Sequence, residues 1–180
     1  DRVLDPAQFL AEHGLRALSR EHREHPFEFA TAPGEVHRVV YEPGESTTYL
    51  FGGNSNWRGP IWFPVNHMLV ESLREYYRHF GKDFTVPLPG EPGRSVTLCE
   101  AADLITDRLT SLFLPDATGR RPVHGTEELY TSDPNFRDLI LFYEYFHGEN
   151  GRGVGASHQT GWTALVATLL AHHGPRGTSP

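Results

Sequence analysis

The sequence predicts an all-α domain built of helical hairpins, and three observations lead to this prediction. Four segments carry apolar residues at the three- and four-residue spacing of amphipathic helices. Alternating strand patterns are sparse, with one short strand expected in residues 35–41. The segments between the helices are rich in Gly, Pro and aromatic residues, and several run to roughly twenty residues, longer than the links of a simple bundle.

Capping residues set the helix boundaries. Asp5, followed by Pro6 and Gln8, predicts a short first helix that Gly14 would close. The strongest helical pattern runs over residues 65–80 and stops at Gly81. The other three expected helices begin at the capping pair Thr97 and Glu100, at Asp133-Pro134, and at Thr160, the last one ending at Gly174-Pro175.

Length and charge limit the protein's class. A chain of 180 residues can form one domain, so we assign residues 1–180 to a single unit. The net charge of −7, with basic residues scattered among acidic ones, argues against a nucleic-acid surface. Cys99 is the only cysteine, which excludes an internal disulfide and a cysteine-based zinc site.

The sequence also bears on location. No apolar run approaches the ~20 residues that span a bilayer, so no membrane segment is expected. The first residues lack the basic and then apolar layout of a secretion signal, which favours a cytoplasmic location. Position 1 is Asp rather than Met, however, which indicates a processed or truncated piece and leaves an exported mature form open.

Two loops combine residue types that a core or a solvated loop does not need. The first, GGNSNWRGPIW at residues 52–62, places Trp57, Arg58 and Trp62 among glycines, which suits a rigid loop that contacts a sugar. The second, residues 142–162, sets Glu144 among aromatic residues. This second loop continues with a run of glycines, followed by His158, Gln159 and Trp162.

Each of these features also has a simpler interpretation. Aromatic neighbours reduce the solvation of Glu144, which makes it a candidate for proton transfer, but it equally fits a helix end that faces water. Ligand contact is favoured over a core position for Trp57, and by less for Trp62.

Metal and cofactor patterns are weak. The glycine run lacks the βαβ frame of a dinucleotide site, and Lys82, the only lysine, is not in a phosphate-binding loop. His22 and His25 are spaced to share an ion but have no convincing third ligand, so we predict no metal and no cofactor.

Two longer strings carry a family resemblance. NSNWRGPIWFPVN (54–66) and EYFHGENGRGVGASHQTGWTALVA (144–167) resemble the C-terminal catalytic region of glycoside hydrolase family 63. That family includes processing α-glucosidases and bacterial mannosylglycerate and glucosylglycerate hydrolases. The resemblance implies an (α/α)6 toroid of six helical hairpins. It also implies inverting hydrolysis by two carboxylates, which lie ~6.5–9.5 Å apart in such enzymes.

The resemblance also implies roles for individual residues. Glu144 matches the general base, and the substrate is a carbohydrate. The family's sugar contacts map to Trp57, Arg58 and Gln159, and we also expect substrate contacts from Trp62, His158 and Trp162 in the same two strings.

The sequence departs from the family in one respect. The family's general acid is an aspartate well upstream of the first string, and no segment before residue 54 matches that region. We therefore expect the chain to be the C-terminal part of a larger catalytic domain, with the missing N-terminal part as its partner. The alternatives are an inverting sugar phosphorylase on a similar toroid and a non-catalytic sugar-binding module.

Overall fold

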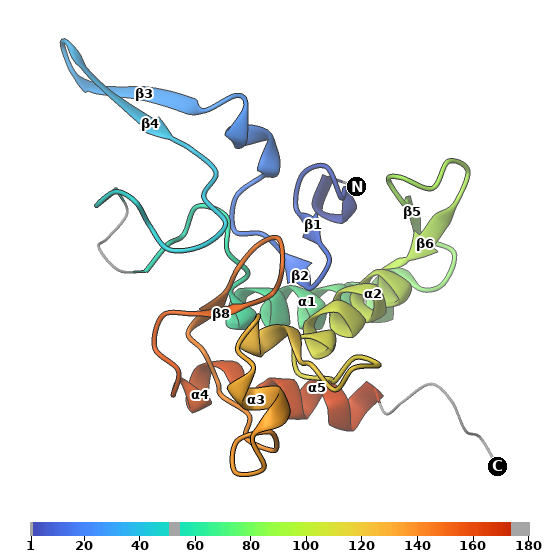
Figure 1. Ribbon diagram of the computed structural model, residues 1–180. Coiled ribbons are helices and arrows are strands. Elements are labelled where there is room, and N and C mark those ends of the chain that lie inside the picture. Colours follow the sequence, from blue (N-terminus) through green and yellow to red (C-terminus); the bar gives the residue numbers. More distant parts are fainter. Residues whose placement is uncertain (1, 51–54, 174–180) are drawn as a thin grey trace.

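The computed structural model describes residues 2–50 and 55–173 and shows a mixed α and β architecture (Figure 1). The prediction of an all-α (α/α)6 toroid is therefore wrong. Between the helices the chain forms small antiparallel sheets instead of further hairpins of helices. The helices are α1 (Phe63–Phe80), α2 (Leu98–Ser111), α3 (Leu129–Ser132), α4 (Thr160–Thr163) and α5 (Val166–His173), with 3-10 turns η1 (Arg2–Leu4), η2 (Arg20–Arg23) and η3 (Pro122–His124).

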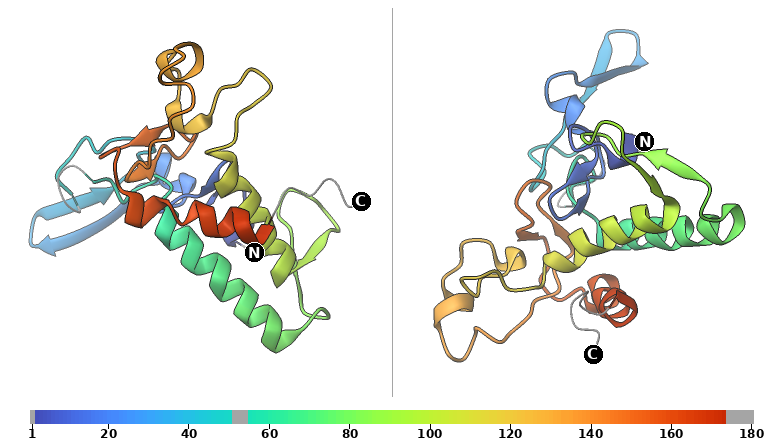
Figure 2. Two further views of the ribbon diagram at one scale, coloured as in Figure 1. Left: turned by 90° about the horizontal axis from the view of Figure 1, so that it is seen from below. Right: turned by 90° about the vertical axis from the view of Figure 1, so that its right-hand side faces the viewer.

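Helices α1 and α2 form the centre of the molecule. They pack against each other, α4 contacts α1, and α5 contacts α2, as the two views of Figure 2 show. Gly81 closes α1 at a positive φ of 74°, and a capping box between Thr97 and Glu100 begins α2. Both of these predicted helices are confirmed. The main core gathers on their facing sides and includes Phe63, Val70, Ala101, Ala102, Ile105, Leu109 and Leu112.

The strands form four separate two-stranded antiparallel sheets. These are β1 (Leu10–Ala11) with β2 (Gly14–Leu15), β3 (Phe27–Ala32) with β4 (Glu35–Val39), β5 (Thr85–Pro87) with β6 (Ser95–Thr97), and β7 (Tyr145–Phe146) with β8 (Gly153–Val154). The β3–β4 hairpin, whose register runs from Phe27 opposite Val39, extends away from the helices (Figure 1). It contains the short strand that was predicted in residues 35–41.

The predicted first helix is replaced by a hairpin. Asp5 does accept hydrogen bonds from the Ala7 amide and the Gln8 side chain, but these close only a turn. Leu10 then pairs with Leu15 across a turn at Glu12 and His13, and Gly14 begins the second strand at a φ of 143°. Burial of this hairpin against α2 outweighs the local helix signal.

The third long helix, predicted to begin at Asp133-Pro134, does not form, and the one-turn helix α3 ends just before it at Ser132. The Asp133 carboxylate accepts from the amide of Asn135, which makes a local turn. Further on, Phe142 forms a bridge with His158, and Phe146 pairs with Gly153. These pairings place Tyr145 and Phe146 in strand β7, where both side chains are fully buried. The segment therefore forms a strand instead of the predicted helix.

The predicted fourth helix is present but broken. It is divided into α4 and α5, and Gln159 rather than Thr160 occupies the N-cap position of α4. The predicted stop at Gly174-Pro175 lies outside the described residues. So do Gly52, Gly53 and Asn54 of the first loop.

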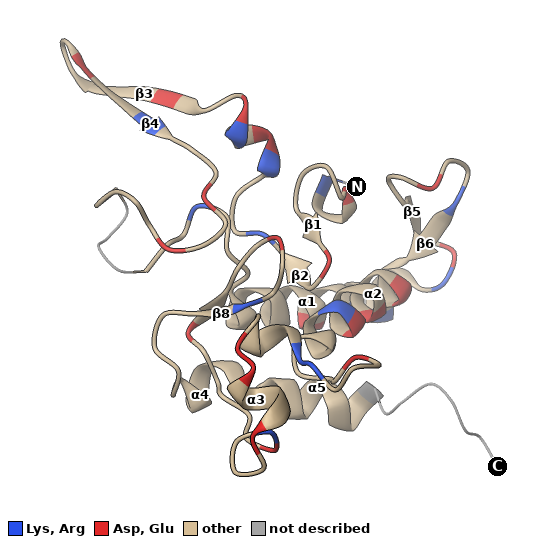
Figure 3. Ribbon diagram, in the orientation of Figure 1, with Lys and Arg blue, Asp and Glu red and all other residues tan. Residues whose placement is uncertain are grey.

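Acidic and basic residues are interspersed over the ribbon in Figure 3. Among the described residues, no helix combines the length and the apolar character needed to cross a bilayer.

Candidate functional site

The two loops that the sequence singled out meet in space. Ile61 and Phe146 exchange both backbone hydrogen bonds, at 2.8 and 2.9 Å, and both side chains are fully buried. Ile61 also bridges to Arg16, so three distant segments form one short antiparallel layer. This layer holds residues 55–62 next to residues 143–146.

Aromatic rings join the same two segments. The ring of Trp62 stacks on that of Trp57, with centroids 3.7 Å apart and planes 3° apart, and on that of Tyr145 at 4.8 Å. Trp162 meets Trp62 edge-on at 6.0 Å. Trp62 is 1% exposed and its indole N–H donates to the carbonyl of Asn56, whereas Trp57 is 41% exposed. Trp62 thus belongs to the core, and Trp57 is the outer ring of the stack.

Glu144 lies half-buried beside this stack. The hydroxyl of Ser55 donates to its Oε1 at 2.6 Å, and the amide of Ala156 donates to its Oε2 at 3.4 Å. Gly155 packs directly on the carboxylate at a φ of 75°, and a Cβ there would come within 2.6 Å of Oε2. Two donors and a glycine therefore fix the carboxylate between the two loops.

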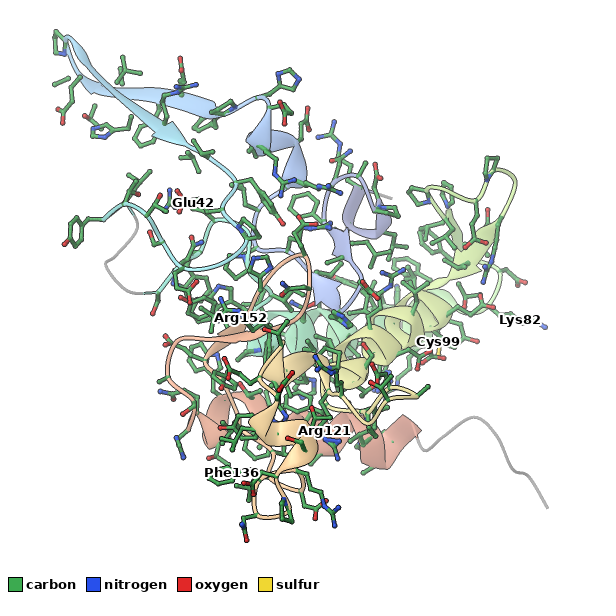
Figure 4. All side chains as sticks on the ribbon, viewed as in Figure 1. Glu42, Lys82, Cys99, Arg121, Phe136 and Arg152 are labelled. Atoms are coloured by element: carbon green, nitrogen blue, oxygen red, sulfur yellow. The ribbon has the colours of Figure 1, made fainter. Side chains whose placement is uncertain are left out.

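Arg58 is buried and engaged with another carboxylate. Its guanidinium donates to Glu42 at 2.8 Å and to the hydroxyl of Ser46 at 2.7 Å, and its side chain is 3% exposed. Thr47 donates to the same Glu42 carboxylate. Figure 4 labels Glu42 on the segment that follows β4. Arg58 thus ties the first loop to residues 42–47.

The other predicted contacts lie at the end of the second loop. His158 is exposed, and its Nδ1 is 2.9 Å from the hydroxyl of Ser157. Gln159 is exposed, and its backbone carbonyl accepts from the amides of Trp162 and Thr163, which begins α4. Trp162 is partly exposed, and one edge of its ring contacts Trp62 in the stack.

Glu149, in the turn between β7 and β8, joins the second loop to the N-terminal segments. It accepts from the hydroxyl of Tyr41 at 2.6 Å and lies 3.2–3.7 Å from Arg16, Arg20 and Arg23. Partial burial alone would raise the pKa of Glu149. The hydrogen bond from Tyr41 and the three guanidinium groups outweigh burial, so that its pKa lies below the ordinary value. Burial and the Glu149 contact raise the pKa of Tyr41.

A second ionic contact anchors the same turn. Arg152, labelled in Figure 4, pairs with Glu45 at 3.2 Å. Burial, followed by the nearby Arg152 charge, lowers the pKa of His147, which favours the neutral ring. Arg152 and Glu45 also line a cavity of about 190 Å³ together with Tyr143 and Gly155. This cavity is polar, and Gly155, which lines it, also lies against the Glu144 carboxylate.

A larger cavity of about 350 Å³ lies beside Trp57 and Trp62. Its other walls are mainly apolar: Val3, Phe9, Leu15, Ala17, Val65 and Leu69, with Arg16 and Asn66. Glu144 does not line it. Over residues 2–50 and 55–173, no group of three or more His, Cys, Asp or Glu side chains is arranged to hold a metal ion.

Sequence reasoning selected the two loops but missed the residues that support them. Ser55 lies in the first string, but the sequence does not show its contact with Glu144, which is 89 positions away. Glu42 and Glu149 were not singled out, because nothing in the local pattern shows which distant cation or hydroxyl a carboxylate will meet. A buried arginine needs a carboxylate partner, but the sequence does not show that Arg58 is buried.

Comparisons with known proteins give one close and two distant relatives, and no protein-family model matches the chain. The chain is 47% identical over 175 residues to the uncharacterized protein YMR196W of Saccharomyces cerevisiae. It is 24% identical over 167 residues to the mannosyl-oligosaccharide glucosidase of the same yeast, and 24% identical over 125 residues to a probable mannosyl-oligosaccharide glucosidase of Schizosaccharomyces pombe.

The share of each chain that is covered differs sharply. These matches take in 96%, 92% and 69% of the present chain but only 16%, 14% and 12% of the three relatives. The chain is therefore distantly similar to glucosidases over most of its length, and it spans about a sixth or less of the proteins that it matches.

Proposed function

We propose that this chain carries the general-base side of an inverting α-glycosidase site, with Glu144 as the base. The observation that carries the proposal is the hydrogen bond of 2.6 Å from Ser55 to Glu144, because it joins the two strings that resemble glycoside hydrolases at a carboxylate. The distant similarity to mannosyl-oligosaccharide glucosidases supports the same reaction class. The substrate class is an α-glucosidic bond in an oligosaccharide or a small glycoside.

The surroundings of Glu144 fit the task of a base. A base must be held within reach of the attacking water, and Ser55 and the Ala156 amide hold this carboxylate in one orientation. Within residues 2–50 and 55–173, the other carboxylate oxygen, Oε2, accepts a single long hydrogen bond, of 3.4 Å from the Ala156 amide. In the proposed reaction this oxygen, Oε2, accepts the proton of a water that attacks the anomeric carbon from the face opposite the leaving group.

The sugar would meet an apolar and a polar surface. The exposed indole of Trp57 supplies a flat apolar face for a pyranose ring. Arg152, Glu45 and Tyr143, which line the small polar cavity, supply partners for hydroxyl groups. Trp62 is buried under Trp57, so in this proposal it supports the Trp57 ring and does not contact the sugar. The general acid that protonates the leaving oxygen would come from a part of the longer protein outside these residues.

The test uses the natural full-length polypeptide and a panel of α-linked glucosides and glycosylglycerates. Glu144→Gln should lower turnover by ~10²–10⁴-fold, since a positioned base contributes about that much. The matched control is Glu128→Gln, which removes an exposed carboxylate at the start of α3 and should leave turnover unchanged. Nuclear magnetic resonance of the first product formed should show the β-anomer, because inversion converts an α-linked sugar.

Each alternative gives a different result in the same assay. A sugar phosphorylase would require inorganic phosphate for turnover and release a sugar phosphate. A binding module would bind a sugar in a titration without cleaving it. Wild-type turnover in Glu144→Gln would remove the assignment of the base, even if the protein is a glycosidase.

A further inference from the structure

A cavity of about 530 Å³ lies next to η3, outside the candidate glycosidase site. Three segments that are distant in the sequence form its walls: the turn between β1 and β2, the chain from the end of α2 to residue 126, and the turn between β7 and β8. Neither Glu144 nor Trp57 lines it. We call it the η3 pocket, and its polar lining includes His13, Arg120, Arg121 and Asn150.

Two adjacent arginines, Arg120 and Arg121, line the η3 pocket. Both are partly buried, and Figure 4 labels Arg121, which directly precedes η3. In the described part of the chain neither guanidinium forms an ion pair or a side-chain hydrogen bond, and Nε of Arg121 is buried without a partner. The fully buried arginines Arg16 and Arg58, in contrast, each face a carboxylate. Two desolvated guanidinium groups without an anion predict an anionic ligand.

The two carboxylates that also line the pocket are engaged elsewhere. Asp116 accepts from the hydroxyl and the amide of Thr118 and from the amide of Arg120, which closes a turn and lowers the pKa of Asp116. Glu12 is exposed to water, and the nearby guanidinium of Arg108 offsets its charge. Neither carboxylate forms an ion pair with the two arginines of the pocket, so both guanidinium groups can bind a ligand.

His13 and Asn150 add an acceptor and a donor. The hydroxyl of Ser111 donates to the carbonyl of Arg108 at 2.6 Å, so its oxygen accepts from Nδ1 of His13 at 2.8 Å. Burial, with a further contribution from the Arg108 charge, lowers the pKa of His13, so that the ring is neutral at pH 7. Its Nε2 can then accept from a ligand hydroxyl. Oδ1 of Asn150 accepts from the amide of Arg152, which leaves the Asn150 NH2 group to donate.

Charge selects the ligand. A phosphomonoester carries about 1.5–2 negative charges at pH 7 and three strong acceptor oxygens, which match two guanidinium groups. A carboxylate, with one charge, would leave the second guanidinium without a partner. We propose that the η3 pocket binds a phosphomonoester of a small polyol, with the phosphate on Arg120 and Arg121 and a hydroxyl group on His13. Since Glu144 does not line the pocket, this inference does not depend on the proposed glycosidase activity.

Isothermal titration calorimetry with the natural full-length polypeptide tests this. The probes are glycerol 3-phosphate, inorganic phosphate and glycerol, because glucose derivatives would also enter the proposed sugar site. We expect glycerol 3-phosphate to bind more tightly than inorganic phosphate, since its hydroxyl groups add contacts. Glycerol, which lacks the charge, should show no measurable binding.

Substitution of the arginines locates the site. Arg120→Gln and Arg121→Gln should each weaken the affinity for glycerol 3-phosphate by about 10–100-fold, because each removes a charged donor to the phosphate. Arg121→Lys, which keeps the charge but not the planar fork, should weaken it less and supplies a second variant if Arg121→Gln does not fold. The matched control is Arg38→Gln, on the β3–β4 hairpin, which should leave the affinity unchanged. Denaturant unfolding checks that each variant is folded.

Three results would overturn the proposal. Glycerol 3-phosphate could fail to bind the natural polypeptide. It could bind folded Arg120 and Arg121 variants as tightly as it binds the wild type, which would place the phosphate elsewhere. Inorganic phosphate could bind as tightly as the ester, which would make the free ion the ligand and leave His13 without a ligand hydroxyl.

Discussion

The α1–α2 pair and the two loops at residues 55–62 and 143–155 are both well buried, but they are stabilised by different kinds of contact. The helices pair through aliphatic side chains such as Ile105 and Leu109, and a local capping box sets where α2 begins. The loops depend on partners far away in the sequence: Ser55 with Glu144, and Tyr41 with Glu149. Aliphatic packing tolerates exchange between residues of similar volume, whereas a paired polar group that loses its partner leaves a desolvated atom behind.

The comparison therefore predicts that single substitutions do most damage in the loops, even though the loops lack regular structure. The stack of Trp57, Trp62 and Tyr145 separates the two effects well, because its inner and outer members differ in exposure.

The largest effect is expected for Trp62→Ala. Trp62 is almost fully buried, stacks on two rings and donates to the carbonyl of Asn56. Loss of such a ring lowers the free energy of unfolding by about 3–5 kcal/mol. Denaturant unfolding of the chain measures this loss. Tyr49→Ala, which removes an exposed ring, is the control and should change little. A loss in Trp62→Ala as small as in the control would show that the stack does not hold the loops.

A smaller effect is expected for Glu149→Gln. Gln keeps the shape but removes the charge that Arg16, Arg20 and Arg23 face. Since hydrogen bonds to charged groups contribute about 1.5–3 kcal/mol, the free energy of unfolding at neutral pH should fall by about that amount or less, given that the side chain is partly exposed.

The pH dependence of Glu149 gives a sharper measurement. The folded-state pKa is below the ordinary value, so the carboxylate stabilises the fold above the unfolded pKa of about 4.3. This contribution is lost as the pH falls through the folded pKa. The difference in unfolding free energy between wild type and Glu149→Gln should therefore shrink from neutral pH to about pH 3. A difference that stays constant over that range would mean that the charge of Glu149 does not matter.

Local signals explain which parts of the fold the sequence predicts. The stop at Gly81 and the capping box at Thr97 act within one helical turn, and both were identified from neighbouring residues alone. Asp5 and Asp133 also make their local contacts, but each closes only a turn. A capping residue therefore predicts where a helix can begin, and tertiary pairing decides whether it continues.

The aromatic segment before residue 147 shows the limit most clearly. Phe142, Tyr143 and Phe146 have spacing that fits a helix, yet Phe146 pairs with both Ile61 and Gly153. That pairing depends on residues 85 positions earlier and 7 positions later, which a helical pattern does not contain. The candidate site, in contrast, is predicted by composition alone, because the two loops combine tryptophans, glycines and charged residues.

Within the helix pair, Thr97→Ala tests how much the local signal contributes. The Thr97 hydroxyl accepts from the amide of Glu100, and the Glu100 carboxylate accepts from the Thr97 amide. Removal of the hydroxyl should lower the free energy of unfolding by about 1 kcal/mol. Amide hydrogen exchange at Glu100 should rise while exchange in the middle of α2 stays slow. Thr97→Ser keeps the hydroxyl and is the control. If both variants unfold alike, the capping box does not stabilise the chain.

A similarly small effect on stability, together with an effect on binding, is expected for Trp57→Ala. Trp57 is 41% exposed and contacts the core through one face, so its removal should lower the free energy of unfolding by about 0.5–1.5 kcal/mol, the contribution of one stacked aromatic pair.

If the exposed indole contacts a sugar, the same substitution should weaken sugar binding well beyond this small change in stability. Titration of an α-glucoside into the natural full-length protein measures the affinity, with Glu144→Gln introduced into both forms to prevent turnover. Trp57→Phe, which keeps an aromatic face, should recover part of the affinity, because the stacking surface rather than the indole N–H makes the proposed contact. A stability loss like that of Trp62→Ala with unchanged affinity would place Trp57 in the core and leave the sugar without its apolar platform.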